Sequence, residues 1–211
     1  MKQTGLIQRV IEAVGLKDGM LKVKFTPSDQ KPLVKDANDK PPSGMFIYGS
    51  IFGMILYLSV HNRPDIYFAV NFCARYMFIP QRYRELELKR LAQYLENTQD
   101  HGLVLDKNYD ILKVDVCPDA EFAGMYWLKK HDDPACANSH TGFIIKSADC
   151  PVLCISKLQT ETSLSTMESE IIALAHCCQE MFPIIDITQS LGKSVWSSSP
   201  VPIDEIVCSR E

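Results

Sequence analysis

The sequence predicts an α/β chain, in which a mostly helical first half precedes a mixed sheet with one long helix. Apolar residues recur at helical spacing through residues 1–105, whereas residues 106–211 hold several apolar segments of strand length before one long helical pattern. The order strand, strand, strand, helix, strand is typical of an α/β sheet unit. We therefore expect two domains, residues 1–105 and residues 106–211.

Helices are predicted in the first half at residues 5–14, 48–60, 65–77 and 81–97. Thr4 is the expected N-cap of the first helix, and Gly15 is its expected end. Pro64 precedes the third helix and Pro80 ends it. Four prolines and six charged residues between positions 26 and 47 predict an extended surface loop.

Strands are predicted in the second half at residues 109–116, 141–146, 151–156 and 201–207, and a long helix at residues 165–190. Ser165 and Glu168 have the spacing of a capping box at the start of this helix. Pro183 is expected to kink the helix or to end it early, because proline lacks the N–H that an interior helical position donates.

The composition is that of a globular protein, with 46% apolar and 23% charged residues. The sequence contains no secretory signal and no apolar run near the ~20 residues of a membrane helix, so we expect an intracellular protein, cytoplasmic or nuclear, without a membrane partner. The net charge of −4 combines a first half at +4 with a second half at −8. A basic surface can bind phosphate backbones and an acidic one divalent cations, although both can be plain solvated surface.

Eight cysteines are present, and without a secretory signal we expect reduced thiols. No Cys-x-x-Cys pair occurs, and the spacing of His131, Cys136, His140, Cys150 and Cys154 fits no common zinc site. The chain also has neither a Gly-x-Ser-x-Gly elbow nor a phosphate-binding Gly-x-x-x-x-Gly-Lys loop. These absences argue against a zinc domain, a serine hydrolase and a P-loop enzyme.

Carboxylates near the first strand and the long helix are the strongest sign of chemistry. Asp119 and Glu121 follow the predicted first strand, and Glu168 and Glu170 lie in the first turns of the helix. Converging carboxylates can hold two Mg²⁺ ions for phosphodiester cleavage. Helix capping explains Glu168 equally well, but Glu170 borders an apolar run, where a carboxylate is costly without a partner.

Three segments of the first half form specific motifs. Residues 48–58 read YGSIFGMILYL, residues 63–71 begin RPDI and end AVN, and residues 90–95 read RLAQYL before Thr98 and Gly102. They are similar to Y-x-S-x-x-G-x-L-x-Y-L, R-P-D-I-x-x-A-V-N and R-x-x-x-Y-L-x-x-T-x-x-x-G of copia-type retrotransposon polyproteins. The resemblance, from about residue 4 to about residue 192, is to the end of the reverse transcriptase and the ribonuclease H domain.

The second half resembles the same family. Residues 117–124 (CPDAEFAG) match its Y-S-D-A-D-W-A-G, Ser139 to Phe143 match S-x-T-G-Y, residues 156–159 (SKLQ) match S-K-K-Q, and residues 164–174 (LSTMESEIIAL) match S-S-T-E-A-E-Y-x-A-L. The resemblance implies a helical reverse-transcriptase remnant followed by a ribonuclease-H-like mixed sheet. It also implies Mg²⁺-dependent cleavage of RNA in RNA/DNA hybrids, with Asp119 and Glu170 as catalytic metal ligands.

Departures from the family weaken the implied activity. The polymerase motif Tyr-x-Asp-Asp is absent, so no polymerase activity is expected. Asp204 is the nearest candidate for a third catalytic aspartate, but the family's following Asn is missing. The family's remaining strand, helix and final catalytic position would come after Glu211, so the ribonuclease-H-like domain is expected to be truncated. We therefore expect weak or absent nuclease activity.

The remaining alternatives are a non-catalytic module and a decayed relic. Arg82, Arg84, Lys89 and Arg90 of the basic first half are candidates to contact a hybrid backbone, or they form a solvated helix face. A non-catalytic module would bind an RNA/DNA hybrid or pair with the remainder of a retrotransposon polymerase. A relic would have no function.

Overall fold

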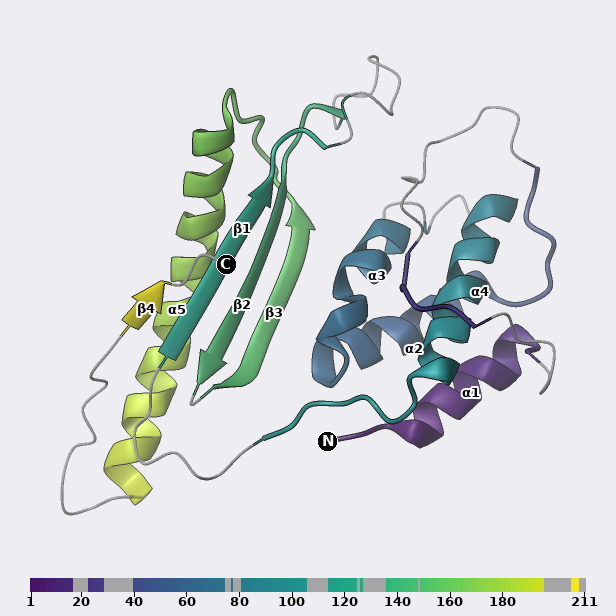
Figure 1. The fold of residues 1–211 in the computed structure, drawn as a ribbon, viewed down its shortest axis with the longest axis horizontal. Coiled ribbons are helices and arrows are strands. Elements are labelled where there is room, and N and C mark those ends of the chain that lie inside the picture. Colours follow the sequence, from purple (N-terminus) through teal and green to yellow (C-terminus); the bar gives the residue numbers. More distant parts are fainter. Residues whose placement is uncertain are drawn as a thin grey trace. The chain divides into compact units, whose positions relative to one another are not determined.

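The computed structural model describes residues 1–16, 23–28, 40–74, 77, 81–105, 114–124, 126, 136–147, 149–195 and 206–208. The chain divides into two compact units, Met1–Leu103 and Val104–Glu211. The first is helical and the second combines a sheet with a long helix, so the fold is mixed α/β (Figure 1).

The N-terminal unit contains the predicted helices. They are α1 (Thr4–Val14), α2 (Tyr48–His61), the 3-10 turn η1 (Pro64–Ile66) with α3 (Tyr67–Ala74), and α4 (Arg82–Asn97). Gly15 ends α1 as predicted: its φ of 72° is left-handed, and its N–H donates to Glu12 O. The N-cap is Gln3 and not Thr4, because Thr4 already belongs to the helix. Pro64 starts a 3-10 turn, so the third predicted helix is split into two elements.

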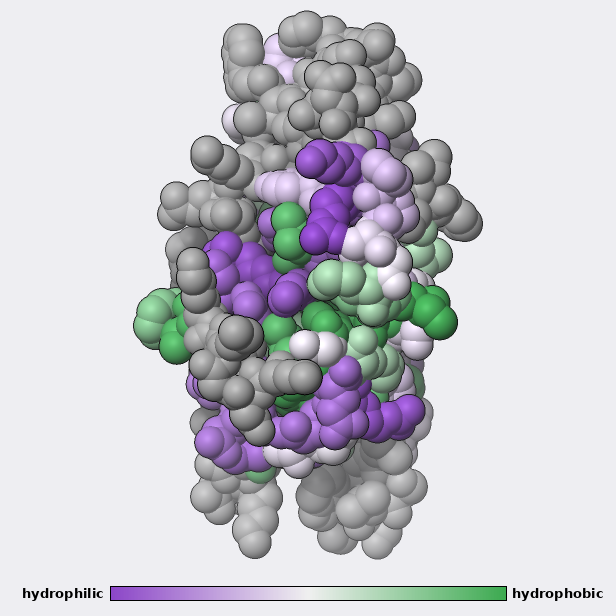
Figure 2. All heavy atoms as spheres, turned by 90° about the vertical axis from the view of Figure 1, so that its right-hand side faces the viewer, coloured by the Kyte–Doolittle hydropathy of each residue, from purple (hydrophilic) through white to green (hydrophobic). Residues whose placement is uncertain are grey.

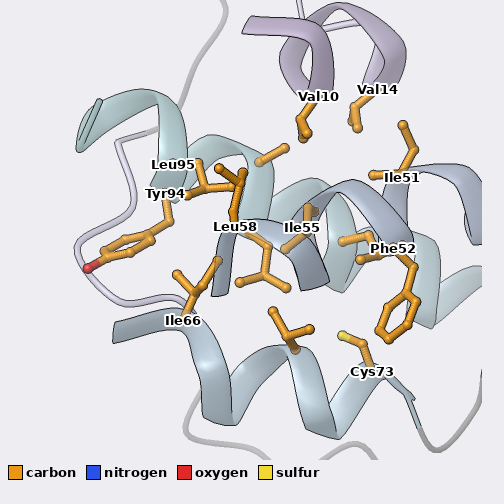
Figure 3. Close-up of a cluster of buried hydrophobic side chains, with 14 of the residues drawn as sticks. Val10, Val14, Ile51, Phe52, Ile55, Leu58, Ile66, Cys73, Tyr94 and Leu95 are labelled. Atoms are coloured by element: carbon orange, nitrogen blue, oxygen red, sulfur yellow. The ribbon is translucent and has the colours of Figure 1, made fainter. Parts of the chain in front are cut away.

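One apolar cluster holds these helices together (Figure 3). Val10 and Val14 come from α1, Ile55 and Leu58 from α2, and Leu95 from α4, and all five side chains are buried. Burying each such side chain contributes about 1.5–3 kcal/mol. Apolar side chains also reach the surface, and the face drawn in Figure 2 mixes hydrophobic with hydrophilic residues, as is normal for a globular domain.

Buried Arg63 ties two motifs of this unit together. Its guanidinium donates to both oxygens of Asp65, at 2.9 and 2.8 Å, and to the O and Oγ1 of Thr98, at 3.0 and 2.6 Å. Tyr94 donates its hydroxyl to Asp65 Oδ2 at 3.0 Å, and its ring centroid lies 5.6 Å from the Arg63 guanidinium carbon. The RPDI segment and the end of α4 therefore form one hydrogen-bonded cluster with a structural role.

The C-terminal unit contains a sheet with strand order β3-β2-β1-β4. β1 (Val114–Glu121), β2 (His140–Ser147) and β3 (Cys150–Leu158) are successively antiparallel, and β4 (Ile206–Cys208) lies parallel to β1. The helix α5 (Thr166–Val195) connects β3 to β4 and packs on β1 and β2. The core between them includes Val116, Phe143, Ile145, Cys177 and Met181.

Two sequence expectations about β1 need correction. Asp119 and Glu121 do not follow the strand but lie within it, because pairing with β2 continues to Glu121 opposite His140. Pro118 is part of the same strand. The pairing of β1 with β4 covers only Val114 to Val116, so in the described residues Pro118 has a strand partner on its β2 side alone. Residues 109–113 of the predicted strand lie outside the described part.

Pro183 does not end α5, which continues to Val195. The expectation of an early end is therefore wrong. Pro183 leaves the carbonyl of Gln179 without a helical donor, and both residues are exposed, so water can bind that carbonyl. Within the described residues, Thr166–Ser190 of this helix is also long and apolar enough to cross a membrane, a test that core helices of soluble proteins pass as well.

Candidate carboxylate and nucleic-acid sites

Asp119 is an exposed residue near the carboxyl end of β1, opposite Gly142 of β2. Val114 and Val116 of the same strand face the α5 core, and side chains alternate along a strand. Asp119 therefore lies, with Cys117 and Glu121, on the face of the sheet turned away from that core. Its carboxylate is open to solvent and to a cation.

Glu170 lies in the second turn of α5 and is half-buried. The neighbouring Glu168 has a separate task, because its Oε2 accepts from Leu164 N at 2.6 Å while Ser165 Oγ accepts from Glu168 N at 3.1 Å. These two hydrogen bonds cap the start of the helix, although the carboxylate accepts from Leu164 N and not from Ser165 N as in the usual capping box. The capping explanation thus applies to Glu168 and not to Glu170.

A buried glutamine links the regions that carry Asp119 and Glu170. Gln159 Nε2 donates to Thr141 Oγ1 at 2.9 Å and to Ser169 O at 3.0 Å. Thr141 pairs with Ala120, the neighbour of Asp119, and Ser169 is the neighbour of Glu170. Asp119 and Glu170 are therefore each close in the chain or in the sheet to a residue that the bridge joins. Figure 1 shows that β1 finishes and α5 begins at the same end of the sheet.

A second set of polar contacts surrounds this bridge. Ser139 Oγ lies 2.6 Å from Ser163 Oγ and accepts from Ala123 N at 3.2 Å, and Ser139 O accepts from Gln159 N at 2.8 Å. Ser139, Thr141, Gln159, Ser163 and Ser169 are all buried. Ser139, Thr141 and Gln159 lie in motif segments of the sequence, but the sequence alone indicated no role for them. The only signal was their place in those motifs, since the contacts join separate elements.

The described residues contain no group of three or more His, Cys, Asp or Glu side chains arranged to hold a metal ion. Asp204, the third candidate, lies outside the described residues, as does His131. Asp119 and Glu170 supply carboxylate oxygens, which suit Mg²⁺, an ion that keeps several waters and is often bound by only one or two carboxylates. The donor chemistry therefore fits Mg²⁺. The seven cysteines whose side chains are described are free thiols.

The basic candidates all lie on α4 but differ in exposure. Arg84 is 1% exposed, so its side chain is not open to a phosphate in this structure. Arg82 is 3.6 Å from Glu85, and Arg90 donates to Thr26 Oγ1 at 2.9 Å. Lys89 is half-exposed. Arg82, Lys89 and Arg90 remain partly accessible, although Arg82 and Arg90 already have partners.

Comparison with known proteins places the chain among transposon polyproteins. It is 32% identical over 145 residues, or 69% of the chain, to the retrovirus-related Pol polyprotein from transposon RE1 of Arabidopsis thaliana. It is 28% identical over 198 residues to that of transposon TNT 1-94 of Nicotiana tabacum. A third relative is the secreted RxLR effector protein 161 of Plasmopara viticola, 32% identical over 133 residues, which are 63% of this chain and 87% of that protein. No protein-family model and no solved structure matches the chain.

The chain belongs to the retrovirus-related Pol polyproteins of copia-type retrotransposons. The matched region is 9% of the RE1 polyprotein and 14% of the TNT 1-94 polyprotein. The chain thus corresponds to a small part of each, and the resemblance seen in its motifs is confirmed at the level of the family.

Proposed function

We propose that the C-terminal unit is a ribonuclease-H-like domain that binds Mg²⁺ through Asp119 and Glu170 and cleaves RNA in RNA/DNA hybrids weakly. The observation that carries this proposal is the topology. Three antiparallel strands are followed by a helix that returns to a strand parallel to β1, so the carboxyl end of β1 meets the amino end of α5. Asp119 and Glu170 lie at this meeting point.

The placement of the two carboxylates limits where an ion would bind. Asp119 faces away from the α5 core, whereas Glu170 belongs to the helix on the core side. An ion held by both would therefore bind at the end of the sheet, beside the Gln159 bridge, and not over either face. When bound, Mg²⁺ would supply charge stabilisation to the phosphodiester undergoing cleavage. Asp119 and Glu170 would fix the position of that charge.

Weak activity is expected for an electrostatic reason. Two carboxylates neutralise less of the charge of a metal pair than three or four would, and metal catalysis depends on fixed coordination. Asp204, the third catalytic candidate of the sequence, lies outside the described residues, and β4 pairs with β1 only at Val114–Val116, the end of the strand away from Asp119. The proposed site therefore rests on Asp119 and Glu170.

The test is cleavage of a labelled RNA/DNA hybrid by the full chain in Mg²⁺. We expect slow cleavage that Asp119→Asn and Glu170→Gln each reduce to background. Glu168→Gln is the matched control, because Glu168 is an exposed capping residue two positions before Glu170, and it should leave cleavage near the wild-type rate. Cleavage that persists in Asp119→Asn and Glu170→Gln would rule out the proposed site.

A non-catalytic hybrid-binding role is the second candidate, and it is favoured by the partly exposed Lys89, Arg82 and Arg90 on one helix. Such binding should weaken steeply as salt rises, because each neutralised phosphate releases counterions. Folded protein that binds hybrid in a salt-dependent way without cleaving it would support this role. Loss of binding in Lys89→Ala, with Lys157→Ala as the control on the other unit, would locate the surface on α4.

A further inference from the structure

Around Ser169, hydrogen bonds from Gln159 join α5 to the sheet. The apolar cluster of the unit meets the helix at Cys177, Met181, Ile184 and Ile185, two or more turns further on, and the small Ala173 is buried one turn beyond Ser169. Near the start of the helix, Gln159 Nε2 bridges Thr141 Oγ1 of β2 and the Ser169 carbonyl of α5. Hydrogen bonds are directional and have a narrow range of lengths. They therefore fix the distance between the start of α5 and the sheet more closely than apolar contact does.

Gln159 is itself fixed in place, so it can fix the position of the start of α5 relative to the sheet. Its side chain is 1% exposed, its backbone N donates to Ser139 O at 2.8 Å, and its backbone O accepts from Asn138 Nδ2 at 2.9 Å. Both backbone groups and the side-chain amide are thus fixed to β2 or to the residues just before it. The amide then reaches the carbonyl of Ser169, the residue before Glu170.

We infer that Gln159 is a positioning residue, which fixes Glu170 relative to Asp119 and so builds the Mg²⁺ site without touching the ion. The inference rests on the proposed function. Gln159 would act as a residue that orients a metal ligand without contacting the ion. Loss of such a residue typically weakens metal binding about 10- to 100-fold.

The test uses the ¹⁵N-labelled full chain titrated with MgCl₂ and followed by amide chemical shifts, which report binding and folding together. Gln159→Met keeps the side-chain length but removes both hydrogen bonds. We expect a Kd for Mg²⁺ raised about 10-fold, in a spectrum that is otherwise that of folded protein. Gln179→Met is the matched control, because it makes the same substitution at an exposed glutamine of α5, and its Kd should equal that of the wild type.

The remaining variants separate the possible failures. If Asp119→Asn and Glu170→Gln leave the Kd unchanged, or the wild type shows no Mg²⁺-dependent shifts near these residues, the proposed function fails. If those two variants weaken binding and folded Gln159→Met does not, the positioning role is overturned and Gln159 is only structural. Thr141→Val, which removes one hydroxyl from the bridge, decides the matter if Gln159→Met does not fold, with a smaller rise in Kd expected.

Discussion

At the scale of single residues, buried polar side chains in both units are placed by several partners at once. Arg63 is 1% exposed and is bound by Asp65, Thr98 and the ring of Tyr94. A buried charge of this kind is tolerated only when it is paired and hydrogen-bonded. The family motif around Arg63 is therefore explained by the packing of the N-terminal unit and not by catalysis.

The Arg63 cluster makes stability depend on pH. Burial acts to raise the pKa of the Asp65 carboxyl, but the hydrogen bonds from Arg63 and Tyr94 outweigh it, and the pKa lies below its ordinary value. A lowered pKa in the folded state contributes stability above the unfolded value of about 4, and this stability is lost as the pH falls through the folded pKa.

Asp65→Asn should therefore remove part of the fall in unfolding free energy between about pH 5 and pH 2. At pH 7 it should cost on the order of 2 kcal/mol, because Arg63 loses a charged hydrogen-bond partner. Urea unfolding across this pH range measures both effects. Asp100→Asn is the control, since Asp100 pairs with Lys2 at the surface; an equal pH dependence in the two variants would contradict the explanation.

At the scale of elements, α5 is the helix on which the site depends. Ser165 and Glu168 cap its start, and its middle packs on the apolar core. The helix continues through Pro183, which is exposed. The cap, the core contacts and Pro183 lie in different parts of α5, so a substitution in one part tests that part of the helix.

Pro183→Ala should stabilise the C-terminal unit. The substitution restores an N–H donor inside a helix and removes a ring that clashes with the preceding turn, which is worth about 1–3 kcal/mol at an exposed position. Circular dichroism should show a higher midpoint of thermal unfolding. Gln179→Ala, an exposed change on the same helix, should move the midpoint far less. A lower midpoint in Pro183→Ala would mean that the proline is required where it is.

Ser165→Ala should weaken the start of α5. The change removes the side-chain acceptor of Glu168 N, and loss of such a cap costs about 1 kcal/mol. Because Glu170 lies in the following turn, hydrogen exchange of the amides near residue 170 should speed up, whereas amides beyond Cys177 should be little affected. Uniform acceleration along the helix would contradict this local effect.

At the scale of the whole molecule, the two units have separate apolar cores. Ile55 and Leu58 belong to the first, and Ile145 and Met181 to the second. Calorimetry of the full chain should therefore resolve two unfolding transitions. Leu58→Ala should lower one of them, with a cost of about 2–5 kcal/mol, and Ile145→Ala the other. A single transition lowered equally by both variants would show that the units unfold together.

What the sequence determined by itself was the local structure and the family. Helical spacing located α1, α2 and α4, Gly15 marked the end of α1, and the spacing of Ser165 and Glu168 identified the cap of α5. These features depend on residues a few positions apart, so they can be recognised from the chain alone. The motifs likewise identified the polyprotein family, which the relatives confirm.

What only the tertiary structure decided was which distant residues meet. The burial of Arg84, the inclusion of Asp119 in β1 and the bridge from Gln159 to Thr141 and Ser169 all depend on pairing between separate elements. Strand register assigns each residue to one face of the sheet, and helix packing determines which polar groups lose water. Neither is encoded in local spacing, so the arrangement around Asp119 and Glu170 became visible only in the folded chain.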